Sequence, residues 1–202
     1  MHNQKKVLTD YRSMLSLTSL TAAEFFEILV PFDELWQRYH AHYDMKGNRR
    51  RIQKFREHGS MSLQGSLDKL FFLLVYLKQN PLQAYHGYSF NMSQGKVSQW
   101  LQFLLPVLEQ ALHRLQMLPC REPSYFYLSL QLLSGQVLLL DATERVIPRS
   151  VDPERQRHEY SGKKGCHTLK NLLVSQPQNR ILYLSATVAG SMHDNALADE
   201  LE

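Results

Sequence analysis

Residues 136–149 read QVLLLDATERVIPR, an apolar run that leads into an acidic residue and reaches a proline before it ends. Four apolar residues in succession, from Val137 to Leu140, are typical of a strand buried on both faces of a sheet. A carboxylate held at the end of such a strand suits a divalent metal, because Mg²⁺ takes oxygen ligands in a fixed octahedral geometry. Asp141 is therefore a candidate metal ligand, although an acid at a strand end more commonly caps a turn. Glu144 would lie on the opposite face of the strand, so the two carboxylates need not converge.

Two more strands and a helix are expected after this one. Residues 167–174 (HTLKNLLV) and 180–188 (RILYLSATV) have strand composition, and the SQPQN sequence between them is a turn signal. The sequence GSMHDNALADELE then predicts the start of a helix, with Asp194 as its N-cap. Consecutive strands followed by a helix indicate part of an α/β domain over residues 136–202.

Upstream of residue 119, apolar residues recur at helical spacing instead. Residues 21–40 (TAAEFFEILVPFDELWQRYH) predict one or two amphipathic helices broken near Pro31. The further helices expected are 66–79, ended by Asn80-Pro81, then 82–88, then a long helix that Ser93 caps and Pro106 kinks or divides. The fold class is therefore α + α/β, a helical domain followed by an α/β part, with the boundary near 119–135.

A short helix, the turn SFNMS and a long helix, in this order, predict a DNA-binding helix-turn-helix over residues 61–118. Val97 and Leu101 would face inward, with Trp100 near the seam. The first turns of the second helix would offer side chains that donate to phosphates or base edges: Ser93, Gln94, Lys96, Ser98 and Gln99. An ordinary helical hairpin with a polar outer face is the alternative that periodicity leaves open.

Positive charge is concentrated in the amino-terminal half. Residues 1–118 carry 14 Lys and Arg against 9 Asp and Glu, whereas residues 119–202 carry 9 against 10. The excess peaks at residues 46–56 (KGNRRRIQKFR), which hold six cations and no acid; Arg49, Arg50 and Arg51 lie within this run. Such a run can neutralise phosphates and release counterions, which gives sequence-independent affinity for DNA or RNA. A solvated loop or mobile arm without a partner is the alternative.

The composition excludes several classes of protein. Apolar residues make up 44% and charged residues 21% of the 202 residues, so the chain can bury a core and is not wholly disordered. No uncharged apolar stretch approaches the roughly 18 residues that a membrane span needs. Cys120 and Cys166 are too few for a disulfide framework, and the amino end shows no apolar leader, so we expect a reducing, cytoplasmic location and no membrane partner.

Three blocks in the second half resemble the DDE transposase domain of bacterial insertion sequences (the insertion-sequence-five-like group) and of Harbinger-like elements. They are LDATERVIPR, EYSGKKGCHTLKN and RILYLSATVAGSMHD. The matching residues are Asp141, Thr143, Glu144, Ile147 and Arg149 in the first, Tyr160, Ser161, Gly162, Lys163, Lys164, His167, Thr168 and Lys170 in the second, and Gly190, Ser191, His193 and Asp194 in the third. Ser150 stands where the family usually has proline. The segment before them also resembles the helix-turn-helix that precedes this domain in the family.

The resemblance implies an RNase H-like fold and cleavage and joining of DNA at transposon terminal repeats, with Mg²⁺ or Mn²⁺ as cofactor. Asp141 matches the first of three catalytic acids, on the first core strand. The blocks that hold the other two have no counterpart in the sequence. Asp194 could be proposed as the second, but its position at a helix start favours capping. We therefore expect an incomplete RNase H-like domain that binds the metal weakly and does not catalyse cleavage.

The organisation that follows is amino-terminal helices and a basic arm over residues 1–60, a helix-turn-helix over 61–118 and a partial catalytic domain over 136–202. Lys163 and Lys164 could meet a DNA backbone beside the metal site, or could be charges that protect a β-hairpin edge. Two functions remain open. The chain is either a transposase fragment that binds double-stranded transposon ends, or an inactive DNA-binding regulator that acts with itself or with full-length transposase. An unrelated helix-turn-helix transcription factor would leave the YSGKK and GSMHD blocks unexplained.

Overall fold

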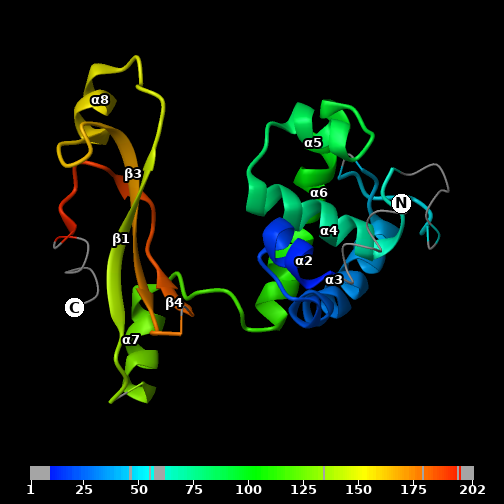
Figure 1. The fold of residues 1–202 in the computed structure, drawn as a ribbon, viewed down its shortest axis with the longest axis horizontal. Coiled ribbons are helices and arrows are strands. Elements are labelled where there is room, and N and C mark those ends of the chain that lie inside the picture. The colour runs from blue at the N-terminus through cyan, green and yellow to red at the C-terminus, as the bar shows by residue number, and fades with distance from the viewer. Residues whose placement is uncertain are drawn as a thin grey trace. The chain divides into compact units, whose positions relative to one another are not determined.

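The computed structural model describes residues 10–45, 47–54, 56, 62–133, 135–178, 180–194 and 196. The chain divides into two compact units, Met1–Met117 and Leu118–Glu202 (Figure 1).

The described part of the amino-terminal unit is built from helices. They are α2 (Tyr11–Thr18), α3 (Ala22–His42), α4 (Gly65–Gln79), α5 (Gln83–Ser89) and α6 (Gln94–Arg114). A capping box begins α3, because the Thr21 hydroxyl accepts from the Glu24 backbone N–H while the Glu24 carboxylate accepts from that of Thr21. The helix α4 ends at Asn80, as the Asn80-Pro81 sequence predicts, and Asn80 adopts the left-handed conformation that is common at helix ends.

The break expected near Pro31 does not occur, because α3 continues through it. A proline inside a helix costs about 3 kcal/mol or more through one lost hydrogen bond and a steric clash. Burying a large apolar side chain gains roughly 1.5–3 kcal/mol. The buried apolar side chains of α3 include Phe25, Ile28, Phe32, Leu35 and Trp36, so packing outweighs the proline. Pro106 likewise leaves α6 undivided.

An aromatic core holds α6 against α3. The ring of Trp36 on α3 lies 5.8 Å from that of Trp100 and 5.7 Å from that of Phe103, both on α6. Lys69 of α4 is fully buried beneath them, with its ammonium 4.7 Å from the Trp36 ring centroid. That ammonium donates to the backbone carbonyls of Leu63 and Gly65 at 3.1 and 2.9 Å, so the buried charge is hydrogen-bonded.

The carboxy-terminal unit is an antiparallel sheet with two helices. Its elements are α7 (Pro123–Leu132), β1 (Leu139–Val146), α8 (Pro153–Glu159), β2 (Tyr160–Ser161), β3 (Cys166–Ser175), β4 (Ile181–Leu184) and β5 (Val188–Ala189). The long strand β3 pairs with each of the other four strands. Neither α7 nor α8 is among the elements expected from sequence.

The strand expected over residues 180–188 is two short strands, β4 and β5. The hydroxyl of Ser185 accepts from the Leu172 backbone N–H at 2.9 Å, where a continuing strand would offer a carbonyl. The Asn171 side-chain amide donates to the Ser185 carbonyl at 2.9 Å and to the Thr187 hydroxyl at 3.1 Å. The Ser185 N–H still donates to the Leu172 carbonyl at 2.9 Å, so the side-chain bonds replace only part of the backbone ladder between the two strands.

The first strand is not buried on both faces. Val137 is 67% exposed and Leu140 is 53% exposed. The strand itself begins at Leu139, and the pairing described for β1 is with β3 alone, so its other edge and part of its apolar surface remain open. The small core of this unit lies instead where α7 meets the sheet, with Phe126 stacked on Tyr183 at 4.9 Å.

Within the described ranges, no single helix is long and apolar enough to cross a membrane; α2 and α3 pass that test only as a pair bent by 58°.

Candidate nucleic-acid interface and carboxylate cluster

The helix-turn-helix is formed by α5, the turn at residues 90–93 and α6. The Met92 N–H donates to the Gly87 carbonyl at 2.8 Å, so the turn folds back onto α5. A Cβ on residue 87 would lie 2.5 Å from the Met92 carbonyl oxygen, which explains the glycine. Ser93 then caps α6, and its hydroxyl accepts from the Lys96 N–H at 3.4 Å. The predicted turn and cap are confirmed.

The first turns of α6 have a buried apolar face and an exposed polar face. Val97, Trp100 and Leu101 are buried, as their spacing predicts. On the other side Ser93, Gln94, Lys96 and Gln99 are exposed, and Ser98 is half-buried. The first turn of α6, which is described throughout, contains no acid. A phosphate approaching this helix end would meet Lys96 and the positive end of the helix dipole without repulsion.

The basic stretch is a loop tied to the end of α3. Tyr43 and Arg49 form an antiparallel bridge, and the Arg50 N–H donates to the His42 carbonyl at 2.7 Å. The Asp44 carboxylate accepts from the Asn48 N–H at 2.9 Å. These contacts close a short turn around residue 47.

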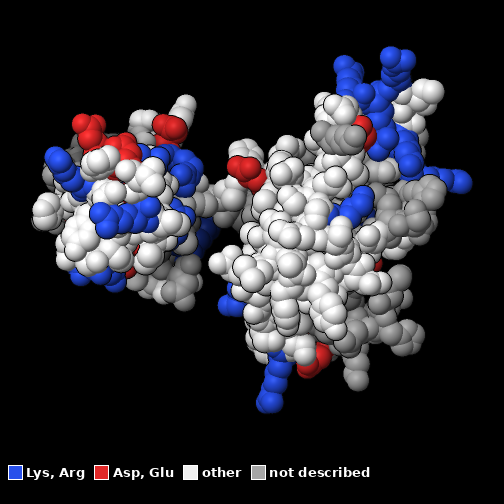
Figure 2. Space-filling view, turned by 90° about the horizontal axis from the view of Figure 1, so that it is seen from above, with Lys and Arg blue, Asp and Glu red and all other residues white. Residues whose placement is uncertain are grey.

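The three consecutive arginines lie in different environments. Arg50 is half-buried, and its Nε donates to the carbonyls of His40 and Tyr43 at 3.2 and 2.9 Å. Arg49 and Arg51 are exposed. Arg50 therefore holds the loop, whereas the other two can reach a phosphate. Figure 2 shows several Lys and Arg side chains gathered at one end of this unit.

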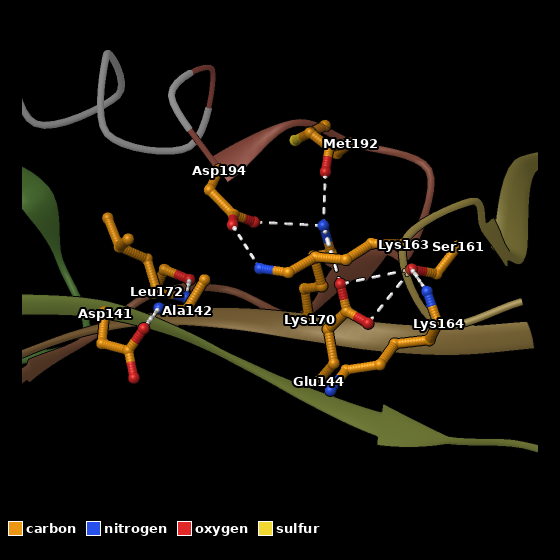
Figure 3. A network of polar contacts seen from close by, with 11 residues as sticks. Asp141, Ala142, Glu144, Ser161, Lys163, Lys164, Lys170, Leu172, Met192 and Asp194 are labelled. Carbon is orange, nitrogen blue, oxygen red and sulfur yellow. Dashed lines mark hydrogen bonds and ion pairs between the residues drawn. The ribbon is translucent and has the colours of Figure 1, made fainter.

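In the carboxy-terminal unit, Glu144 and Lys170 form the centre of an ion network (Figure 3). The two residues lie directly opposite each other on β1 and β3, with Oε1 and Nζ 2.9 Å apart. Their side chains are only 7% and 6% exposed. The Lys170 ammonium also donates to the Asp194 carboxylate at 3.1 Å and to the Met192 carbonyl at 2.8 Å. The Ser161 hydroxyl donates to Glu144 at 3.1 Å.

The network keeps its groups ionised. Burial raises the pKa of Glu144, but hydrogen bonds from Lys170 and Ser161 outweigh it and hold the pKa below its ordinary 4.5. Burial would lower the pKa of Lys170, but hydrogen bonds to Glu144 and Asp194 reverse this, so that pKa is raised. The hydrogen bond from Lys170 lowers the pKa of Asp194 below its ordinary 3.8. At neutral pH the network therefore holds two carboxylates around one buried ammonium.

Lys163 and Lys164 lie in the turn between β2 and β3. The Lys163 ammonium is 3.8 Å from the Asp194 carboxylate, and its side chain is 73% exposed. The Lys164 backbone N–H donates to the Ser161 hydroxyl at 3.3 Å. Both lysines are exposed, so they can meet an approaching phosphate. The contacts described for the Asp194 side chain go to lysines, and most of the residues after it, where we expect the helix that it would cap, lie outside the described residues.

A close contact between Gly190 and Thr168 joins the third of the three blocks to the second. The Gly190 N–H donates to the Thr168 carbonyl at 2.9 Å. A Cβ on residue 190 would lie 2.0 Å from the Thr168 hydroxyl and 2.8 Å from its carbonyl oxygen. Thr168 is fully buried, so its neighbours leave little room for it to move. The glycine of the GSMHD block is therefore needed for this close approach.

Asp141 lies apart from the network. It is exposed, and its Oδ1 accepts from the adjacent Ala142 N–H at 2.9 Å. Strand alternation directs it away from the Glu144 face. Among the described residues, no group of three or more His, Cys, Asp or Glu side chains could hold a metal. Two-ion chemistry requires several converging carboxylates. A single exposed carboxylate does not fit that requirement, and no metal-dependent step follows from these residues.

Sequence reasoning missed the pairing of Glu144 with Lys170. The signal was present, because Lys170 interrupts the otherwise mostly apolar strand HTLKNLLV and so places a charge in a buried strand. A buried lysine requires a partner, and only the strand register identifies Glu144 as that partner.

Comparison with known protein families finds one matching segment in each half of the chain. Residues 62–114 match the model described as helix-turn-helix of DDE superfamily endonuclease. Residues 140–202 match the model described as DDE superfamily endonuclease. No curated protein matches the chain, and no solved structure does. The predicted fold class, a helical helix-turn-helix region followed by strands and helices of an RNase H-like domain, is confirmed.

Proposed function

Since the chain belongs to the DDE superfamily of endonucleases, we propose that it binds the terminal repeats of a transposon as double-stranded DNA. The observation that carries this proposal is the division of α6 into two faces. Val97, Trp100 and Leu101 anchor the helix, while Lys96 and Gln99 project from its first turns. A helix held in this way can enter the major groove as a rigid body.

The side chains on the exposed face divide into two kinds. Gln94 and Gln99 carry amides that can bond adenine N6 and N7 together, which is a base-reading contact. Lys96 supplies a charge for a backbone phosphate. Ser93 is occupied as the helix cap, and half-buried Ser98 has less reach. We assign the further phosphate contacts to Arg49, Arg51, Lys163 and Lys164.

For cleavage and strand joining, we propose that Asp141 supplies one metal-binding carboxylate of a DDE endonuclease. The remaining ligands would come from outside the described residues, and Mg²⁺ or Mn²⁺ would be the ion. The reaction class is DNA transposition of the insertion-sequence type, in which this chain pairs with itself or with a full-length transposase. We place the chain in the cytoplasm.

A second candidate function is regulation without cleavage. Of the three acids that match the family in these blocks, Glu144 and Asp194 are engaged by Lys170, which leaves Asp141 as the acid outside this network. Such a chain would occupy transposon ends and compete with a complete enzyme. The two functions separate in a nicking assay on supercoiled plasmid with Mn²⁺. Nicking that Asp141→Asn abolishes would identify an enzyme, and binding without nicking would identify the regulator.

The DNA-binding proposal is tested by fluorescence anisotropy with a labelled 30-base-pair duplex. Log affinity should fall linearly with log salt concentration, and Lys96→Gln should reduce that slope by about 1. Lys78→Gln, an exposed lysine on α4, is the control with the same change of charge. Absence of duplex binding by the wild-type chain at low salt, or equal slopes for the two variants, would overturn the proposal.

A further inference from the structure

A pocket of about 320 Å³ lies at the far end of the helix-turn-helix unit, away from the first turns of α6. Three segments each contribute one arginine to it: Arg38 from α3, Arg49 from the loop after α3, and Arg114 from the end of α6. Arg38 and Arg49 are exposed, and the Arg114 side chain is 43% exposed, so all three can meet a ligand from solvent.

The pocket is electropositive. None of the described residues that line it is acidic. Arg114 of the pocket forms an ion pair with Glu34 at 3.1 Å, and the Glu34 side chain is 67% exposed. The ends of α3 and α6 contribute a negative partial charge of roughly half an elementary charge each. Three full positive charges outweigh these opposing charges.

The walls of the pocket are rigid. Tyr39 and Tyr43 stack at 4.7 Å between ring centroids, and Tyr39 packs edge-on against Phe103 at 4.6 Å. The His42 ring is held on both sides, by the Arg38 carbonyl at 2.8 Å and the Gln53 amide at 3.0 Å. The arginines are the positively charged groups that this pocket offers to a ligand. The planar guanidinium group can donate two parallel hydrogen bonds to two oxygens of a tetrahedral phosphate.

The pocket is separate from the base-reading surface. Lys96 and Arg114 are eighteen residues apart on α6. At 1.5 Å of rise per residue this separates them by about 27 Å. That distance equals the length of about eight base pairs of B-DNA at 3.4 Å each. A phosphate bound here would lie outside the segment that the first turns of α6 read.

We propose that the arginine pocket formed by Arg38, Arg49 and Arg114 binds a backbone phosphate of DNA outside the segment read by α6. This inference rests on the proposed DNA-binding function. The pocket would fix the position of the unit on the DNA without reading bases, because phosphate contacts set register and orientation.

The test uses the full chain and a labelled 30-base-pair duplex. The double variant Arg38→Gln/Arg49→Gln should reduce the salt slope by about 2 and weaken binding at 0.1 M salt by roughly tenfold or more. Glu34→Gln should do the opposite and tighten binding, which a purely structural role would not cause. Arg12→Gln on α2, an exposed arginine outside the pocket, should leave the slope within the error of wild type. Melting temperatures of all variants are measured to confirm folding.

Three other outcomes would overturn the inference in distinguishable ways. If the wild-type chain binds no duplex, the proposed function itself fails. If Lys96→Gln lowers the slope but the double arginine variant does not, DNA binding stands and the pocket is wrong. Titration calorimetry with sodium phosphate gives the third outcome. If the double variant loses phosphate binding while its DNA slope is unchanged, the pocket takes a small free phosphate and not DNA.

Discussion

Glu144 and Lys170 face each other across β1 and β3 as an almost fully buried ion pair, 2.9 Å apart. The pair joins the first matched block to the second, and Asp194 joins the third block to the second through Lys170. Most of the charged residues that these blocks share with the family therefore contact one another. These contacts hold the blocks together around β3, while Asp141 is exposed to solvent on the other face of β1.

Removing the ammonium should destabilise the carboxy-terminal unit strongly. Lys170→Met leaves the Glu144 carboxylate without its buried partner, which typically costs about 3–5 kcal/mol. Hydrogen exchange of the β3 amides measures the loss. Both tryptophans lie in the amino-terminal unit, so their fluorescence should not change. Lys164→Met, at an exposed lysine nearby, should have little effect. Wild-type protection of β3 in Lys170→Met would show that the pair does not stabilise the fold.

The same network predicts a loss of stability in acid. Glu144 and Asp194 have pKa values lowered by folding, so their contribution is present above their ordinary values of 4.5 and 3.8. It is lost as the pH falls through the still lower folded values. Lys170, whose pKa is raised from 10.5, loses its contribution only at more alkaline pH. The stability of the carboxy-terminal unit, measured by hydrogen exchange of the β3 amides from pH 3 to 7, should decrease toward acid pH. In Glu144→Gln this stability should depend less on pH. A curve of unchanged shape in that variant would contradict the assignment.

A methyl group at residue 190 should disrupt the contact between the second and third blocks. In Gly190→Ala the Cβ would overlap the Thr168 hydroxyl and carbonyl, and both belong to a fully buried residue. Overpacking of this kind costs about 1–3 kcal/mol or more. Gly162→Ala is the matched control, because nothing lies within 4 Å of a Cβ there. Thermal unfolding followed by far-ultraviolet circular dichroism should separate the two variants; equal melting temperatures would refute the steric argument.

Arg50 and Arg51 should have different roles, Arg50 in stability and Arg51 in DNA binding. Arg50→Gln removes donors to the carbonyls of His40 and Tyr43, and should lower the stability of the amino-terminal unit by about 1–3 kcal/mol. Arg51→Gln should leave stability unchanged and reduce the salt slope of DNA binding by about 1. Denaturation followed by tryptophan fluorescence, together with anisotropy, measures both. The reverse pattern, with Arg51 structural and Arg50 electrostatic, would contradict the loop geometry.

The sequence predicted the helical half well, because local signals determine it. Ser93 as a cap, Asn80 as a helix end and the inward spacing of Val97 and Leu101 are each local features, and all are confirmed. The break predicted at Pro31 was wrong because it rested on the low helix propensity of proline, which is a local property. The helix continues because Trp36 and its neighbours are buried in tertiary contacts. The split of the last strand and the pairing of Glu144 with Lys170 depend on contacts across the sheet. No single segment contains that information.

We propose above that the first turns of α6 read the sequence of double-stranded DNA. The most direct measurement is selection of binding sites from a pool of random duplexes by the wild-type chain, by Gln99→Ala and by Gln131→Ala, a control at an exposed position on α7. We predict that the wild-type chain and the control enrich one common sequence, and that Gln99→Ala loses preference at one or two adjacent base pairs while retaining affinity for random duplex. Enrichment of the same sequence by Gln99→Ala, or no enrichment by the wild-type chain, would contradict the claim.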